Sequence, residues 1–340
     1  MTTKKDDSNK FLHIADFIQD DYQSTFILGA RGVGKTISTL VYCIKKAYNN
    51  HSKFIYLRRY QREIDNLGLN VQLLSDLTGL NVEYVTDKDP NGRSVSMIKA
   101  EGEMVAWVLA LNTVAQYKSN DYSNTFLIVY DEFIDVKNRE IKGEVGLFLT
   151  YAETVFRDFS KFRALFLANA TNIFNSYFIE WNCIPHGKVT KFKRKNKHGK
   201  VVKLIKVVMY KTSGELQDEH ENSGLGMLAL MTNADDPNIT NNFDVPDDFV
   251  KKQQAKAKCT YIVNLAGSDY GLWQGDYFTI SKNFDPSRPR VSIDNLSEAY
   301  DYRPFWLVGL SESLKNKHLT FSDSITRGVW LKAMKEKRLI

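Results

Sequence analysis

The stretch Gly29-Ala30-Arg31-Gly32-Val33-Gly34-Lys35-Thr36 matches the pattern G-x-x-x-x-G-K-[ST] and directly follows the apolar run Thr25-Phe26-Ile27-Leu28. The apolar run predicts a short strand. Apolar residues at helical spacing predict a helix over 35–48, with one face formed by Leu40, Val41, Ile44 and Ala47. A strand before and a helix after is the context that this phosphate-binding pattern requires.

The residue types in this stretch suit the binding of a nucleotide. Glycine allows a tight turn whose N–H groups point at phosphate oxygens, and the helix N-terminus adds partial positive charge. Lys35 can reach the β- and γ-phosphates, and the Thr36 hydroxyl can ligate Mg²⁺. The predicted nucleotide-binding residues are Gly29, Ala30, Arg31, Gly32, Val33, Gly34, Lys35 and Thr36.

Composition indicates an ordinary globular protein of two or three domains. The chain has 340 residues, of which 43% are hydrophobic and 25% charged, and its formal net charge is +6. Three scattered cysteines support neither a disulfide framework nor a zinc site, which favours a reducing, cytosolic setting. No apolar run is long enough to span a membrane, so we expect no membrane partner. Residues 1–20 are expected to form a disordered polar lead-in.

A second buried strand, 126–130, ends in Asp131-Glu132. Asp131 suits the Mg²⁺ shell as the partner of Thr36, and Glu132 is placed to orient or deprotonate a water that attacks the γ-phosphate. A signalling GTPase would need an N-K-x-D motif, which this sequence lacks. The acidic pair therefore favours ATP as the substrate, with Mg²⁺, and hydrolysis coupled to mechanical work.

Other polar residues follow predicted strands of the same sheet. Arg58 and Arg59 follow the strand 54–57, where one of them could contact phosphate or a subunit interface, or both could be a solvated strand end. Asn169 follows the strand 164–168 and is predicted to sense the γ-phosphate, although it could simply cap a turn. Strands over 94–98 and 104–111 are expected to form a hairpin in or beside the sheet.

Five blocks of the sequence together are more specific than the phosphate-binding pattern alone. GARGVGKT, YLRRY, VYDEF, ETVFR and LANAT resemble, in this order, the DNA-packaging ATPases of small phi-twenty-nine-like tailed bacteriophages, which are related to the large terminases. The resemblance covers roughly residues 20–185 and is looser afterwards. It implies an ATP-driven homo-oligomeric ring, usually a pentamer, that pumps double-stranded DNA into a procapsid through the portal vertex in the host cytoplasm. In part of the family a packaging RNA helps to dock the ring.

The resemblance also implies roles for individual residues. Lys35 and Thr36 are the P-loop pair, Asp131 holds Mg²⁺ and Glu132 is the catalytic glutamate. Arg157, in ETVFR, matches an arginine finger that enters the site of a neighbouring subunit. Lys118 matches a position where a second trans-acting cation is suspected.

A basic segment follows the first domain. Residues 188–206 contain nine Lys or Arg and no acid, and their pattern predicts a hairpin with strands over 189–195 and 200–210. Its cations could bind nucleic-acid phosphates without regard to sequence, or they could protect a solvated sheet edge from aggregation. The predicted nucleic-acid contacts are Lys191, Lys193, Arg194, Lys195, Lys197 and Lys200.

The expected fold is α/β, with a mostly parallel P-loop NTPase sheet of the ASCE type flanked by helices. The expected domains are the lead-in over 1–20, the ATPase domain over 21–186, a basic hairpin and linker over 187–250 and a C-terminal domain over 251–340. The family suggests a small α+β RNase H-like fold for the last domain. Two-metal cleavage needs clustered carboxylates, and the best strand there, 260–266, has none, so we expect no nuclease activity. Asp269, Asp276, Asp285 and Asp294 are expected in turns, and helices near 296–300 and over 325–336.

Three functions agree with these features. The first is a ring ATPase that translocates duplex DNA, favoured by Glu132, Arg157 and the five blocks. The second is a nucleotide-switched nucleic-acid-binding assembly factor, which would not need both residues. The third is a helicase-type DNA-dependent ATPase, which would stack bases on aromatic side chains, whereas the basic hairpin holds only Phe192 and Tyr210 as aromatics.

Overall fold

A computed structural model describes residues 12–29, 32–88, 92–117, 120–134, 141–169, 175–181, 183, 185, 188–210, 254–265, 267–293, 309–310, 313 and 318–336. The chain divides into two compact units. Unit 1 comprises residues 1–176 and 185–243, and unit 2 comprises residues 177–184 and 244–340.

Unit 1 is built on a nine-stranded sheet in the order β3-β4-β5-β2-β6-β7-β1-β9-β8. The strands are β1 (Ser24–Gly29), β2 (Lys53–Arg58), β3 (Val82–Lys88), β4 (Ser94–Ala100), β5 (Glu103–Ala110), β6 (Thr125–Asp131), β7 (Ala164–Asn169), β8 (Val189–Lys195) and β9 (Val201–Tyr210). From β5 to β9 each neighbouring pair in this order is parallel. The predicted mostly parallel α/β sheet is therefore confirmed.

The basic hairpin belongs to this sheet, which corrects the expected boundary at residue 186. Strand β9 pairs with β1 in parallel along its length, from Ser24 opposite Ile205 to Gly29 opposite Tyr210. The apolar residues Val207 and Val208 are buried by this pairing. Antiparallel β8 then forms the edge of the sheet, as β3 does at the opposite edge. The first domain therefore extends beyond the segment predicted from the sequence.

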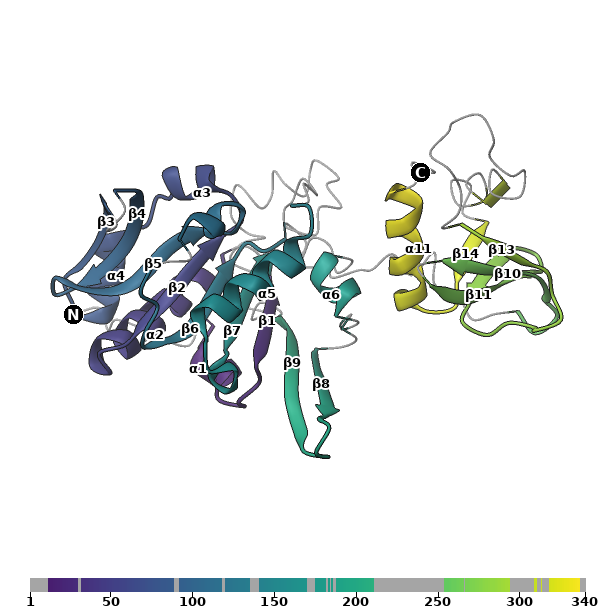
Figure 1. Ribbon diagram of the computed structural model, residues 1–340, viewed down its shortest axis with the longest axis horizontal. Coiled ribbons are helices and arrows are strands. Elements are labelled where there is room, and N and C mark those ends of the chain that lie inside the picture. The colour runs from purple at the N-terminus through teal and green to yellow at the C-terminus, as the bar shows by residue number, and fades with distance from the viewer. Residues whose placement is uncertain are drawn as a thin grey trace, which may run out of the picture. The chain divides into compact units, whose positions relative to one another are not determined.

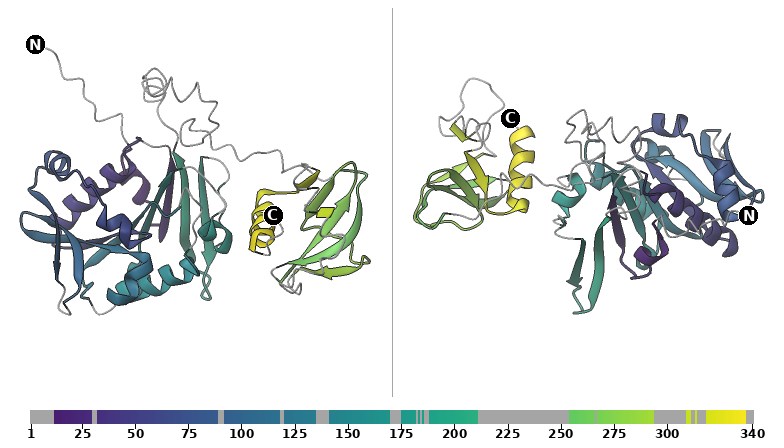
Figure 2. Two further views of the ribbon diagram at one scale, coloured as in Figure 1. Left: turned by 90° about the horizontal axis from the view of Figure 1, so that it is seen from above. Right: turned by 180° about the vertical axis from the view of Figure 1, so that it is seen from behind.

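Helices cover both faces of the sheet, as Figures 1 and 2 show. Helix α2 (Lys35–Asn49) covers one face and buries Leu40, Cys43 and Ile44 among the core residues of β1, β2 and β6. Helix α5 (Glu144–Val155) covers the other, where Phe148 meets Tyr130 and Phe166. The smaller helices of unit 1 are α1 (Ala15–Ile18), α3 (Gln61–Asp65), α4 (Val71–Thr78), η2 (Leu111–Tyr117) and η3 (Phe159–Lys161).

Unit 2 is a small α+β domain, as predicted. Its five-stranded sheet has the order β13-β10-β11-β12-β14, formed by β13 (Arg290–Ser292), β10 (Lys258–Leu265), β11 (Ser268–Gln274), β12 (Phe278–Ser281) and β14 (Leu319–Phe321). Strands β10, β11 and β12 form an antiparallel meander, and β13 runs parallel to β10. Helix α11 (Ser324–Glu336) adds the buried Trp330 to the core, and α6 (Ser176–Glu180) contributes most of its residues to this unit.

Three further predictions can be compared with this unit. The helix predicted over 325–336 is confirmed by α11, whereas the helix near 296–300 and Asp294 lie outside the described residues. Asp269 was expected in a turn but lies in β11, because the tight turn before it occupies Gly267. Among the described helices, none has the length and hydropathy that a bilayer crossing requires.

Candidate nucleotide site

The loop between β1 and α2 places its lysine over the end of the sheet. Gly32 and Gly34 have φ values of 80° and 78°, a region that strongly favours glycine. The Lys35 ammonium donates to the Gly29 carbonyl oxygen at 2.8 Å, and the side chain is largely buried. Ala30 and Arg31 lie outside the described residues. This geometry places a cation and a helix N-terminus at one point.

Four residues that the sequence places after three different strands meet at this point. Asn169 lies opposite Gly29 in the sheet, and its Oδ1 accepts a hydrogen bond from Lys35 Nζ at 3.2 Å. The Thr36 hydroxyl donates to Asp131 Oδ2 at 3.0 Å. The carboxyl ends of parallel strands share one sheet edge, and this is why residues up to 134 positions apart converge.

Arg58 lies in the same site and contacts both carboxylates. Its guanidinium is 3.2 Å from Asp131 Oδ2 and 2.5 Å from Glu132 Oε2, and its side chain is 11% exposed. Burial alone would lower the pKa of Arg58, but the negative charges of Asp131 and Glu132 help to raise it above its ordinary value. Arg58 is therefore a fixed cation between the two acids.

Tyr56 is a site residue that sequence reasoning missed. Its hydroxyl donates to Asp131 Oδ2 at 2.6 Å, and the ring is buried among the residues that pack on α2. Burial, together with the Asp131 charge, raises the pKa of Tyr56 well above its ordinary value, so the hydroxyl is a permanent donor. A tyrosine inside an apolar strand looks like a core residue, and only the pairing of β2 with β6 places it here.

Glu132 has a strained backbone. Its φ is 52°, a value that residues other than glycine seldom adopt, and its N–H donates to Asp131 Oδ1 at 3.0 Å. The side chain is 55% exposed, in contrast to Asp131 at 4%. Strain of this kind is found preferentially at functional sites, and here it turns the second acid out toward the cavity.

Arg59 faces away from the site and forms a buried ion pair. Its Nε and Nη2 contact the Glu144 carboxylate at 3.2 and 2.6 Å, and the Tyr130 hydroxyl donates to Glu144 Oε1 at 2.6 Å. Arg59 and Glu144 are each only 4% exposed. Of the two arginines, Arg58 lies in the site, while Arg59 links β2 to the start of α5. A phosphate or interface contact for one of them stays a prediction.

A cavity of about 1010 Å³ opens beside these residues. One wall is polar and holds Lys35, Thr36, Asp131, Glu132 and Asn169. The rest of the cavity wall is mainly apolar. Its residues come from the segment before α1, from the β1–α2 loop, from α2 and from α4, and they are Leu12, Ile14, Val33, Ile37, Val41, Tyr42, Leu73 and Leu77. The volume of the cavity, and its separation into a polar wall and an apolar wall, suit a ligand with a charged end and an apolar end.

The model of the Podovirus DNA encapsidation protein (Gp16) family matches residues 7–329. This chain belongs to that family. The resemblance detected in the sequence is thereby confirmed, and the site above lies within the matched residues.

Similar proteins and structures cover nearly the whole chain. It is 26% identical to the DNA packaging proteins of Bacillus phage phi29, over 98% of this chain and 99% of that protein, and of Bacillus phage B103, over 92% and 97%. A structure of the phi29 viral genome packaging motor assembly matches with a TM-score of 0.67 at 23% identity, covering 97% of this chain and 100% of that one. The Phi-28 gp11 DNA packaging motor matches with a TM-score of 0.62 at 18% identity, covering 98% and 99%. These structures share the fold.

In this member of the Gp16 family, Arg157 lies far from its own nucleotide site. It follows the C-terminal end of α5 and precedes β7, at the amino edge of the sheet, whereas Glu132 lies at the carboxyl edge. Asp121, which precedes β6, has a lowered pKa, first because of hydrogen bonds from Ser123 and also because of the nearby Arg157 charge. Arg157 is exposed. Lys118 lies outside the described residues.

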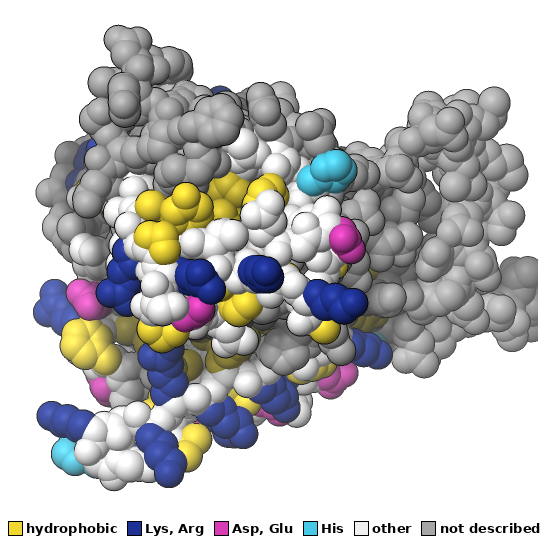
Figure 3. All heavy atoms as spheres, turned by 90° about the vertical axis from the view of Figure 1, so that its right-hand side faces the viewer, with side chains coloured by type: hydrophobic (Ala, Val, Ile, Leu, Met, Phe, Trp, Pro, Cys, Tyr) yellow, Lys and Arg dark blue, Asp and Glu magenta, His cyan; other side chains and the backbone are white. Residues whose placement is uncertain are grey.

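The hairpin places its cations at the surface. The cations beyond Lys191 are exposed, namely Lys193, Arg194, Lys195, Lys197 and Lys200. Basic side chains gather along the projection at the lower edge of Figure 3, where the hairpin lies by its place in Figure 1. Lys191 differs from them, because its ammonium is 3.2 Å from Asp20 Oδ2, which also binds Lys206 at 2.8 Å.

The Asp20 contacts predict an acid-sensitive contribution to stability. Hydrogen bonds from Lys206 and then Lys191 lower the pKa of Asp20 to about 2, so the contribution is complete above about pH 4 and is lost as the pH falls toward 2. Because Asp20 is 40% exposed, we expect Asp20→Asn to reduce the free energy of unfolding at pH 7 by about 1 kcal/mol or less. Urea unfolding at pH 7, 4 and 2.5 measures this. A difference that does not shrink below pH 4 would contradict the assignment.

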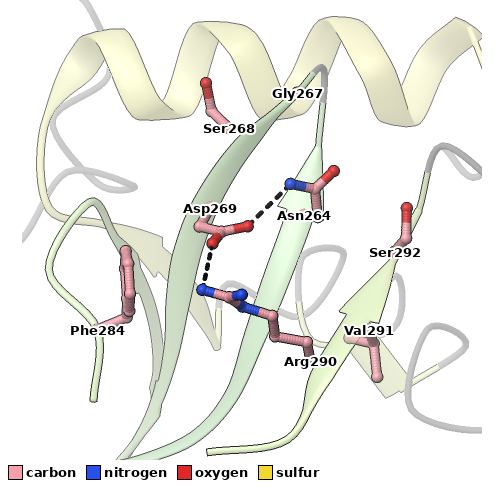
Figure 4. A pocket seen from close by; sticks show the side chains of 8 residues that line it. All are labelled: Asn264, Gly267, Ser268, Asp269, Phe284, Arg290, Val291 and Ser292. Carbon is pink, nitrogen blue, oxygen red and sulfur yellow. Dashed lines mark hydrogen bonds and ion pairs between the residues drawn. The ribbon is translucent and has the colours of Figure 1, made fainter. Parts of the chain in front are cut away.

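Unit 2 contains a cavity of about 640 Å³ between β10, β11 and β13 (Figure 4). Asp269 is the acid among its lining residues, and both carboxylate oxygens are engaged. Arg290 Nη2 is 2.9 Å from Oδ2, and Asn264 Nδ2 donates to Oδ1 at 2.8 Å. Among the described residues, no group of three His, Cys, Asp or Glu is placed to hold a metal ion. Absence of nuclease activity stays a prediction.

Proposed function

We propose that this chain is the subunit of an ATP-driven motor that moves double-stranded DNA into a viral procapsid. One observation carries the proposal. A lysine, a hydroxyl, two carboxylates and an amide from three strand ends converge on one cavity, in a member of a DNA encapsidation family. Lys35, Thr36, Asp131, Glu132 and Asn169 are the residues involved.

The phosphates of ATP are proposed to bind at the β1–α2 loop. Lys35 would exchange the Gly29 carbonyl for phosphate oxygens, which are better acceptors for an ammonium group. Asn169 already lies 3.2 Å from Lys35 Nζ, so it would report the presence of the γ-phosphate directly. The apolar part of the cavity, with Tyr42 and Leu77, would take the purine base.

The residues present fit a magnesium ion. Thr36 and Asp131 supply a hydroxyl and a carboxylate oxygen 3.0 Å apart, and Mg²⁺ prefers oxygen ligands of this kind. When bound, the ion neutralises charge on the phosphates. Tyr56 and Arg58 hold the Asp131 carboxylate in place from the protein side.

Glu132 is proposed to orient and deprotonate the attacking water. Its carboxylate lines the cavity and is more than half exposed, and so a water can reach it. In the arrangement described here Arg58 binds that carboxylate at 2.5 Å. Glu132 must therefore exchange Arg58 for water before it can act as a base, and this exchange is a step at which hydrolysis can be controlled.

The motor is proposed to be a homo-oligomeric ring on the portal of a procapsid in the host cytoplasm. The position of Arg157 supports a ring, because the residue is exposed at the sheet edge opposite its own site. In a ring, each Arg157 would lie against the nucleotide of the next copy and stabilise the negative charge of the transition state.

The exposed cations of the hairpin are proposed to contact the phosphates of duplex DNA. Lys193 and Lys203 face each other across β8 and β9, and like charges at such a position are unfavourable unless an anion is near. We expect Lys193→Gln with Lys195→Gln to weaken duplex binding, with a salt slope reduced by about 1 to 2. Fluorescence anisotropy at several salt concentrations measures this, with Lys88→Gln and Lys99→Gln as the matched control. An unchanged slope would favour the alternative, a lysine-protected sheet edge.

A packaging assay tests the proposed function as a whole. Duplex DNA, ATP, this protein and procapsids of its own phage are mixed, and DNA protected from nuclease is measured. We expect ATP-dependent protection, and its loss with Lys35→Ala. Protection that does not need ATP, or that survives Lys35→Ala, would contradict the proposal.

A further inference from the structure

Two adjacent arginines at the end of β2 connect the nucleotide site with α5. Successive side chains of a strand point to opposite faces of the sheet. Arg58 therefore contacts Asp131 and Glu132 on the face covered by α2, while Arg59 contacts Glu144, the first residue of α5, on the other face.

The neighbouring strand β6 repeats this arrangement. Asp131 accepts hydrogen bonds from Thr36 and Tyr56 on the site face, and Tyr130, one residue earlier, donates to Glu144 on the α5 face. Each of these two strand ends therefore contacts the nucleotide site through one residue and the start of α5 through the adjacent residue. A backbone shift at either strand end would reach both faces.

The Arg59–Glu144 ion pair is buried, and the stability of the fold alone does not require an ion pair at this position. Both residues are 4% exposed, and replacing a buried ion pair by apolar residues is often neutral or stabilising. The first turn of α5 begins at Gly143, which provides no side-chain cap. The orientation of this turn therefore depends on the carboxylate of Glu144, which Arg59 and Tyr130 hold at 2.6 Å each.

Helix α5 is rigidly packed between its two ends. Phe148 and Tyr151 are fully buried, and the Phe148 ring stacks on Tyr130 with 5.9 Å between centroids and 8° between planes. The helix has 12 residues and is about 18 Å long. Arg157 follows its far end. A small tilt or slide at Glu144 would therefore displace Arg157.

We propose that Arg59 and Glu144 are positioning residues that fix the orientation of α5. Through this pair, the state of one nucleotide site determines whether Arg157 of the same copy reaches the site of the next copy. This inference rests on the proposed trans-acting role of Arg157. It assigns a regulatory connection between neighbouring sites to a specific buried ion pair, and it predicts that Glu144 acts on the neighbour's hydrolysis and not on its own.

Mixed oligomers separate these two effects. A donor carrying Glu132→Gln has an inactive site and an intact Arg157, and an acceptor carrying Arg157→Ala has an intact site only. Neither should hydrolyse ATP alone, and their mixture should recover hydrolysis at acceptor sites. Glu144→Gln is then placed in the donor or in the acceptor. The exposed Glu153→Gln on the same helix is the matched control.

We expect Glu144→Gln in the donor to lower the recovered hydrolysis at least about tenfold, because a misplacement of about 1 Å can cost about 10²-fold in rate. In the acceptor it should change the rate by less than about twofold, and Glu153→Gln should have no effect in either. Because Glu144→Gln could impair folding, an Arg59→Met, Glu144→Met donor is tested as well. That pair should retain stability by the argument above and still lose recovery.

The outcomes distinguish this inference from the proposed function. If the reference mixture recovers no hydrolysis, Arg157 does not act in trans, and the proposed role of Arg157 fails together with this inference, while the packaging assay still decides the motor function. If it recovers, and stable donors with Glu144→Gln or the Met pair are as effective as the reference donor, only the inference fails. Equal loss in donor and acceptor would also contradict it, since that result indicates a general structural effect.

Discussion

Glu132→Gln is expected to lower kcat for ATP hydrolysis about 10² to 10⁴-fold, the range for loss of a general base. Glutamine keeps the size of the side chain and tolerates the same backbone, so nucleotide binding should change little. Isothermal titration with ATP and Mg²⁺ measures binding, and phosphate release measures turnover. Glu83→Gln, an exposed glutamate on β3, is the control.

The comparison of ATP binding with ATP turnover in this variant decides whether Glu132 is the base. If Glu132→Gln abolishes nucleotide binding as well, the residue serves to hold the site together with Arg58, and its assignment as the base fails. If turnover is unchanged, another group activates the water, and the acidic pair has been misread.

Arg157→Ala is expected to have an effect at least as large, about 10³ to 10⁵-fold in kcat, if the residue acts as an arginine finger. Its own site is untouched by the change, so ATP binding to an isolated subunit should be normal. Lys161→Ala, which removes another exposed cation from the same segment, should leave turnover within about twofold of wild type.

The trans action of Arg157 can be read from its dose dependence in mixtures. With increasing amounts of a subunit that carries both Glu132→Gln and Arg157→Ala, wild-type activity should fall more steeply than the wild-type fraction, because each such subunit is inactive itself and also disables a neighbour. A fall strictly proportional to the wild-type fraction would indicate independent subunits and would contradict the placement of Arg157 in a neighbouring site.

The central chemistry could be predicted from sequence because it follows strand ends. The phosphate-binding pattern fixes Lys35 and Thr36, and an apolar run that ends in Asp131 and Glu132 fixes the acids, since parallel strands share one carboxyl edge. Tyr56 was missed because a buried tyrosine in an apolar strand resembles core. The contact between Arg59 and Glu144 joins residues 85 positions apart, and no local pattern marks it.

The place of the basic hairpin could not be derived for a related reason. Alternating residues predicted both strands correctly, but the partner of β9 is β1, which lies far away in the sequence. A strand pattern indicates which face is apolar and does not name the neighbouring strand. Strand β3 was not predicted because most of its side chains are exposed, and so no apolar run marks it.

Steady-state ATP hydrolysis with no DNA, with single-stranded DNA and with duplex DNA tests the central claim most directly. The motor described here should be stimulated by duplex DNA at low salt, and stimulation should decline as salt screens the phosphate contacts. Hydrolysis that is indifferent to duplex DNA in an intact oligomer would contradict the account and favour a nucleotide-switched assembly factor. Stimulation by single strands alone would contradict it in favour of a helicase.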